Sequence, residues 1–142
     1  MRNKIQVFSA ALLGTCVAFI LWTTILGREK TMSKPLAYLT FKAMPYYLKD
    51  LQRKGLRGNF LGNILLFTPA AFFWTMSLGW KNSWKTVILL GFFFSLAIEL
   101  IQYFTVKGVL DISDILLNVI GTTVGWFIGK KVRKKLADTV PM

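Results

Sequence analysis

Carboxyl and amide side chains occur within stretches of this 142-residue chain that are otherwise apolar. A carboxylate near the centre of a bilayer costs about 2.5–3.5 kcal/mol to insert, so such a group indicates a functional site by default. Glu99 is the clearest case, because it lies about eight residues, or some 12 Å of helix, inside Lys107. Oxygen-bearing side chains at this depth are suited to bind a hard cation or to couple to a proton.

The polar residues of three segments have the spacing of a helix face, with steps of three or four. They are Asn59 and Asn63, Glu99 and Gln102, and Asp111, Asp114 and Asn118. With four crossings of the membrane, the helix ends that carry them lie on the same side. The connection at 104–109 is short, so the segments on either side of it must be antiparallel neighbours. We therefore predict one polar pocket just beneath one membrane face, and we expect Arg57 to pair with one of its acids.

Four apolar segments position these residues. They are 5–26, 60–80 with Pro69 inside it, 86–104 and 110–129. Each is long enough, or nearly so, to cross a hydrocarbon core about 30 Å thick. The first segment is too long for a signal-peptide core and no small-residue cleavage site ends it, so it is predicted to be a retained anchor. The basic run at 130–135 is expected to stop the fourth. The sequence predicts an all-α integral membrane protein, a four-transmembrane-helix bundle that forms a single domain over 1–142.

The composition supports a lipid environment. Hydrophobic residues make up 54% of the chain and the mean hydropathy is +0.51, while charged residues make up 17% against about 25% in soluble domains. The net charge of +12 comes from Lys and Arg between and beyond the spans, where anionic lipid headgroups attract them, and we expect no nucleic-acid partner. A single cysteine, Cys16, and no histidine exclude intramolecular disulfides, Cys/His zinc sites and histidine-based triads.

The long connection at 28–58 alternates apolar residues with Lys and Arg. Pro35 and Pro45 each suit the first turn of a short helix. This pattern predicts a short amphipathic segment, helical and lying in the membrane interface, between the first and second spans.

Several of these residues also have a purely structural interpretation. Small residues at helical spacing allow close packing of helices, and this applies to Gly121, Gly125 and Gly129, and to Ala10, Gly14 and Ala18. Asp111 suits a helix N-cap, with Asp114 in the first turn favouring the helix dipole. The two asparagines at the start of the second span also suit a cap or hydrogen bonds between helices.

Three ordered blocks of the sequence resemble the VanZ-like family. They are NFLGNILLFTP at 59–69, ELIQ at 99–102 and DISDILLNVIG at 111–121 followed by Gly125, within 59–129. The resemblance implies a small bacterial membrane protein of the group named for a teicoplanin-resistance factor, whose molecular activity is not settled. Carried over residue by residue, the family's polar positions are Asn59, Asn63, Glu99, Gln102, Asp111, Asp114 and Asn118, which are those of the predicted pocket.

Three functions remain open at this point. The first is a non-enzymatic protein, without cofactor or assigned metal, that engages membrane lipids, a lipid-linked envelope precursor or a lipophilic glycopeptide of the teicoplanin type. The second is a membrane-embedded enzyme that uses a divalent cation on a phosphate-bearing lipid. The third is a small oligomeric transporter with Glu99 as its proton-coupling acid.

The expected location is the bacterial cytoplasmic membrane, crossed several times. Lys and Arg divide equally between the two sides, so the positive-inside rule gives no preference. The densest basic run, at 130–135, favours both termini in the cytoplasm. This orientation puts the predicted pocket on the outer face.

Overall fold

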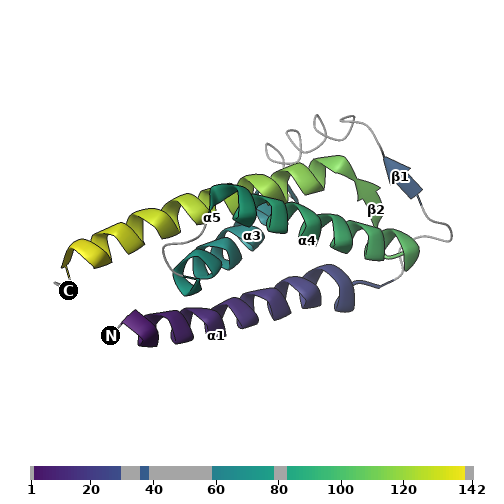
Figure 1. The fold of residues 1–142 in the computed structure, drawn as a ribbon. Helices are drawn as coiled ribbons and strands as arrows, with labels where there is room; N and C mark the ends of the chain where they lie inside the picture. The colour runs from purple at the N-terminus through teal and green to yellow at the C-terminus, as the bar shows by residue number, and fades with distance from the viewer. Residues whose placement is uncertain (1, 30–35, 39–58, 79–82, 140–142) are drawn as a thin grey trace.

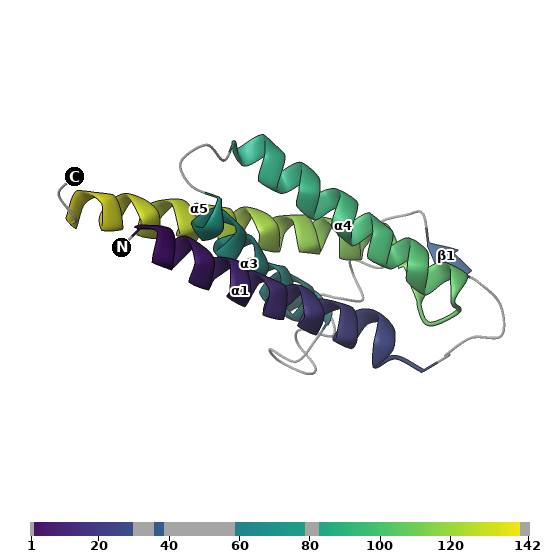
Figure 2. The same ribbon diagram turned by 60° about the horizontal axis from the view of Figure 1, so that its bottom comes forward.

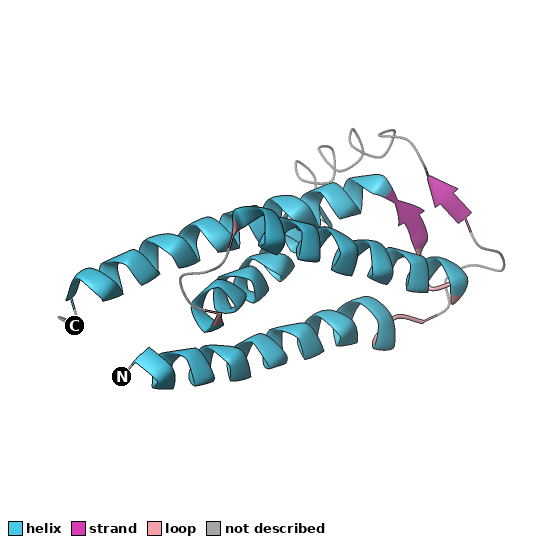
Figure 3. Ribbon diagram, in the orientation of Figure 1, coloured by secondary structure: helices cyan, strands magenta, loops and turns pink. Residues whose placement is uncertain are grey.

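The computed structural model describes residues 2–29, 36–38, 59–78 and 83–139. In chain order its elements are α1 (Arg2–Leu21), the π-helix η1 (Trp22–Leu26), β1 (Leu36–Tyr38), α3 (Asn59–Ser77), α4 (Trp84–Phe104), β2 (Val109–Asp111) and α5 (Ile112–Thr139). The helices run along a common long axis, and the two strands lie together at one end (Figures 1 and 3).

Three of the described helices are long and apolar enough to cross a membrane. They are Lys4–Leu26, which joins α1 to η1, then α4 and α5, while the apolar part of α3 is the shorter stretch Leu61–Ser77. Large apolar side chains such as Phe8, Phe93 and Phe127 are exposed on the outer faces of these helices, where a lipid environment accommodates them. The chain therefore has the helices of a membrane protein. Of the four predicted crossings, three meet the length of a span.

The helix α5 lies at the centre of the assembly. It packs along α3 on one side and against α4 on the other, and α1 packs on the far side of α3 (Figure 2). Ile20, Phe67 and Ile98 form a buried apolar cluster that joins α1, α3 and α4. The polar residues of three helices are thereby brought to one end of the bundle.

Glycines make the contact between α5 and α3 very close. A Cβ on Gly121 would meet the carbonyl oxygen of Ile64, and one on Gly129 would lie 2.9 Å from the Cβ of Thr75. The hydroxyl of Thr68 donates to the carbonyl oxygen of Gly121 at 3.2 Å, across the same contact. Gly91 has a similar role on α4, because a Cβ there would lie 2.7 Å from Cγ2 of Thr122. Residues without a side chain thus set the spacing of the three central helices.

The small residues of α1 are placed differently from the prediction. Ala10, Gly14 and Ala18 are all exposed, and no atom lies within 4 Å of the position of a Cβ on Gly14. Their interpretation as helix-packing residues is therefore wrong for contacts within the described chain. The face of α1 that packs is the one carrying Ser9 and Ile20, which are both buried.

The helix α5 continues ten residues beyond the predicted end of its span, to Thr139. The basic run ends the apolar stretch but not the helix, because its side chains find partners along it. Arg133 is buried and donates from Nη1 to the carbonyl oxygen of Thr75 at 2.8 Å, which satisfies a carbonyl at the C-terminal end of α3. Lys131 lies with its Nζ 4.6 Å from the ring centroid of Phe127.

A short parallel ladder replaces part of the predicted interfacial helix. Leu36 pairs with Val109, Ala37 with Leu110 and Tyr38 with Asp111. The prediction of a helix is therefore wrong for residues 36–38. Residues 30–35 and 39–58 of the predicted segment lie outside the described part of the chain. The pairing gives backbone partners to β2, which lies between α4 and α5.

The packing predicts opposite effects for the same substitution at two glycines. Gly125→Ala should lower the free energy of unfolding by about 1–3 kcal/mol, because the new Cβ meets the carbonyl oxygen of Thr68 and lies 2.9 Å from the Cβ of Ala71. Gly14→Ala, in open space on α1, should be neutral or stabilise by up to about 1 kcal/mol. Denaturant titration of both variants in mild detergent measures the difference, and equal stability would contradict the packing.

Candidate functional site

Glu99 is buried at the junction of α4 and α5. Its side chain is 3% exposed, and its Oε2 accepts a hydrogen bond from the backbone N–H of Asp111 at 3.2 Å. Asp111 is itself 7% exposed, and its Oδ1 accepts from the backbone N–H of Ser113 at 2.8 Å. This is N-cap geometry, since Asp111 directly precedes α5. The two carboxyl groups therefore lie together where α5 begins.

Asp114 joins the same end of the bundle to α3. The amide Nδ2 of Asn63 donates to Oδ1 of Asp114 at 2.8 Å, and both residues are half-buried. Asp114 lies in the first turn of α5, close to Asp111. Asn59 begins α3 one turn before Asn63, but its side chain lies outside the description. Three helices thus contribute to one group of polar side chains.

A second polar layer lies one helical turn deeper. Asn118 of α5 donates from Nδ2 to the hydroxyl of Ser95 on α4 at 2.8 Å, and both residues are buried. The other amide atom, Oδ1 of Asn118, is buried and has no hydrogen-bond partner among the described residues, and the same is true of the Ser113 hydroxyl. A buried acceptor without a partner is costly, so these atoms are available to a bound group.

Gln102 faces α1 instead of the acids. Its Nε2 donates to the carbonyl oxygen of Thr24 at 2.8 Å, and the Nζ of Lys107 donates to that of Ile25 at 2.9 Å. Both carbonyls belong to η1, at the end of the first helix, where carbonyl groups lack partners within the helix. Gln102 and Lys107 therefore cap η1 and attach it to the site. This role of Lys107 was not predicted from the sequence, because its partner, Ile25, lies 82 residues away along the chain.

Among the described residues, Arg28 is a cation within electrostatic reach of Glu99. The predicted Arg57 lies outside the described residues, so its pairing with an acid stays a prediction. A Cβ on Gly108 would lie 3.3 Å from Nη1 of Arg28 and 3.2 Å from Oε1 of Gln102, so both side chains reach this buried glycine. The signal available in the sequence for Arg28 was its position directly after the first span, on the side where the acids lie.

We name Asn63, Ser95, Glu99, Asp111, Asp114 and Asn118 the polar cluster. Its ionisable members are carboxyl groups, so it offers hydrogen-bond acceptors and negative charge, with Arg28 at its edge. Among the described residues, no three Asp, Glu, His or Cys side chains form a set that could hold a metal ion. The arrangement is suited to accept hydrogen bonds from a donor-rich or cationic group.

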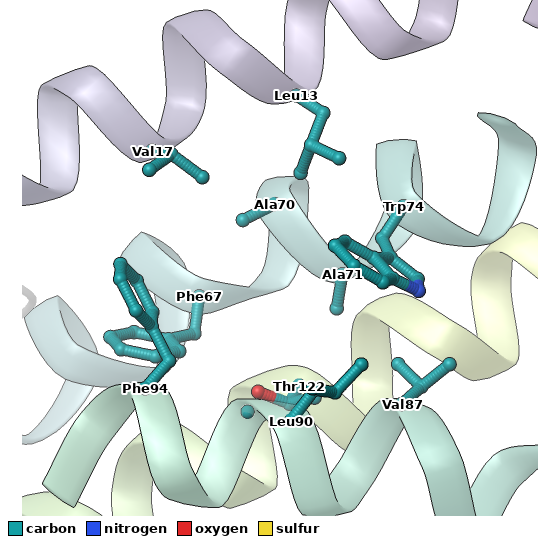
Figure 4. A pocket seen from close by; sticks show the side chains of 11 residues that line it. Leu13, Val17, Phe67, Ala70, Ala71, Trp74, Val87, Leu90, Phe94 and Thr122 are labelled. Atoms are coloured by element: carbon teal, nitrogen blue, oxygen red, sulfur yellow. The ribbon is translucent and has the colours of Figure 1, made fainter. Parts of the chain in front are cut away.

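An apolar cavity of about 230 Å³ lies deeper in the bundle, between α1, α3, α4 and α5 (Figure 4). Its wall includes Gly91, one turn before Ser95 on α4, and Thr122, one turn after Asn118 on α5. The hydroxyl of Thr122 donates to the backbone carbonyl of Asn118 at 2.9 Å. The Ser95–Asn118 pair therefore lies between the cavity and the acids.

The sequence of the chain matches the model of the VanZ/LLP1 family over residues 7–133. This match covers most of the chain, and the protein therefore belongs to the VanZ-like family. No curated protein and no solved structure matches the chain.

The link between α3 and α5 predicts energetic coupling between two side chains. Asn63→Ala and Asp114→Ala together should cost less than the sum of the single changes, with a coupling of about 0.6 kcal/mol and at most about 1.7 kcal/mol. The coupling arises because the two side chains share one hydrogen bond. Denaturant titration of the four proteins in mild detergent measures it.

The control pair is Asn63→Ala with Thr123→Ala. Thr123 is on α5 and exposed, and its hydroxyl bonds only within its own helix, to Val119. Its effect should add to that of Asn63→Ala. Coupling of equal size in both pairs would contradict a specific link between Asn63 and Asp114.

Proposed function

We propose that this VanZ-like protein binds the polar part of a membrane lipid, a lipid-linked envelope precursor or a lipophilic glycopeptide through the polar cluster, without catalysing a reaction. We further propose that its role is resistance to teicoplanin-type antibiotics, as the family resemblance implies. The observation that carries the proposal is the burial of Glu99 beside Asp111 and Asp114 at one end of the bundle.

Burial of these acids in a membrane costs free energy, so their presence indicates a function. An insertion cost of about 2.5–3.5 kcal/mol applies to an ionised carboxyl group at the bilayer centre. One backbone N–H satisfies a single oxygen of Glu99, and Asn118 retains an acceptor without a partner among the described residues. A ligand that presents several N–H or O–H donors satisfies such acceptors. Glycopeptides and amine-bearing or hydroxyl-bearing lipid headgroups belong to this chemical class.

The proposal places the polar cluster on the outer face of the bacterial cytoplasmic membrane. In this arrangement α3 also crosses the membrane, as the second of four spans, and both chain termini are cytoplasmic. The support is the basic end of α5, where Lys130, Lys131, Lys134 and Lys135 are exposed or half-buried at the opposite end from the cluster. A cluster on the outer face meets a drug or an envelope precursor as it arrives.

The burial of Glu99 is also compatible with proton coupling, but the metal-dependent enzyme and the proton-coupled transporter each need more than the polar cluster. A metal-dependent reaction needs a set of oxygen ligands around one ion, and a transporter of this size needs further copies to build a path. The binding function needs only the acceptors that the described residues bring together.

Removal of negative charge from the polar cluster should abolish the proposed function. A susceptible bacterium that produces the wild-type protein should tolerate more of an acylated, teicoplanin-type glycopeptide than cells without it. The double variant Glu99→Gln, Asp114→Asn should return the minimum inhibitory concentration to that of cells without the protein. Susceptibility to a glycopeptide that has no acyl chain should not change.

The matched control is Glu29→Gln, which removes one carboxylate from an exposed position outside the cluster and close to the end of η1. This variant should retain full protection. Membrane levels of all variants are compared by immunoblotting. Protection by the double variant at equal protein level would contradict a role for the cluster, and absence of protection by the wild-type protein would contradict the resistance function itself.

A further inference from the structure

We propose that the apolar cavity is a binding site for one acyl chain of a membrane lipid. The space of about 230 Å³ is bounded by side chains from separate helices that point toward one another (Figure 4). The residues that line it include Leu13 and Val17 of α1, Ala70 and Trp74 of α3, and Leu90 and Phe94 of α4.

The wall of the cavity is suited to hydrocarbon and not to water. A buried water needs two to four polar partners, and apolar cavities stay dry. The wall offers the hydroxyl of Thr122, whose hydrogen is already donated to Asn118, and the indole of Trp74, whose Nε1 has no partner among the described residues. An alkyl chain in this space gains the dispersion contacts that an empty void lacks.

The cavity is open to the surrounding lipid between α1 and α4. These two helices pack on α3 and α5 respectively, and α4 meets the first helix mainly at η1. They diverge from that end, as Figure 2 shows. Leu90 lines the cavity and is 44% exposed, so the same side chain faces both the cavity and the lipid-facing surface. An acyl chain can therefore enter sideways from the bilayer.

The position of the cavity favours the chain of an amphiphilic lipid over an unrelated apolar molecule. Gly91 and Thr122 in its wall lie one turn from Ser95 and Asn118, which belong to the polar cluster. An acyl-chain site here would hold the apolar part of the lipid whose polar part the cluster binds. The biological role of the site therefore rests on the proposed function. The polar cluster then takes the head of a lipid and the cavity takes one of its tails.

Brominated lipids test the cavity directly, because bromine on an acyl chain quenches the fluorescence of an adjacent indole. The reporter is the full chain with Trp74 retained and Trp22, Trp80, Trp84 and Trp126 changed to Phe. It is reconstituted in phosphatidylcholine vesicles whose acyl chains carry bromine. We expect strong quenching of Trp74, and loss of most of it when Ala70→Leu fills the cavity from α3.

Val17→Phe fills the cavity from the opposite wall and should have the same effect, so the test does not depend on the folding of one variant. Ala18→Leu is the matched control, since Ala18 is on α1 and exposed, and it should leave the quenching unchanged. The inference is overturned if Trp74 is not quenched in the reporter, or if quenching survives both filling variants when they are folded.

A second reporter separates the cavity from lipid contact in general. A chain that retains Trp84 alone carries its indole at a position that is 51% exposed, and this fluorescence should be quenched equally with and without Ala70→Leu. Glu99→Gln with Asp114→Asn should leave most of the quenching of Trp74, because the bilayer supplies acyl chains in large excess beside the cavity even when the head of the lipid is no longer held. Failure of the resistance test and failure of the cavity test are therefore distinguishable.

Discussion

The hydrogen bond from the backbone N–H of Asp111 to Glu99 joins the connection between α4 and α5 to the helix that precedes it. Backbone polar groups near the hydrocarbon must find partners within the protein, because the membrane supplies none. The bond meets this need for Asp111 and gives the buried Glu99 a donor. The Asp111 side chain then caps α5 through Ser113, so this short segment determines where α5 begins and which of its faces meets α4.

The register of α5 against α3 follows from the same starting point. Glycines at 121, 125 and 129 let the two helices approach until backbone meets backbone, and only one alignment puts all three against α3. In that alignment Asn63 reaches Asp114 at one end and Arg133 reaches the last turn of α3 at the other. The packing that stabilises the bundle is therefore also what brings the polar cluster together. Substitution of these glycines should disturb both the packing of the bundle and the arrangement of the polar cluster.

The spacing of polar residues predicted much of this arrangement, because residues three or four positions apart lie on the same face of a helix whatever the tertiary structure. Glu99, Asp111, Asp114 and Asn63 were identified in this way. Contacts that depend on the tertiary structure were not predicted from the sequence. For example, η1 accepts hydrogen bonds from Gln102 and Lys107, which are distant in sequence. The strand at 36–38 was missed for the same reason, since its partner lies more than 70 residues away and its own residues have no strong strand pattern. Alternating charge in that region resembled an interfacial helix.

In the proposed orientation the polar cluster lies at the outer face of the membrane, at the opposite end of α5 from its basic residues. Thiol labelling in intact cells tests it most directly. On a Cys16→Ser background, single cysteines replace Thr105, beside the cluster, and Asp138, near the end of α5. The account predicts that a membrane-impermeant thiol reagent labels the cysteine at 105 in intact cells and the cysteine at 138 only after lysis. Labelling at 138 but not at 105 would put the cluster in the cytoplasm and contradict the account.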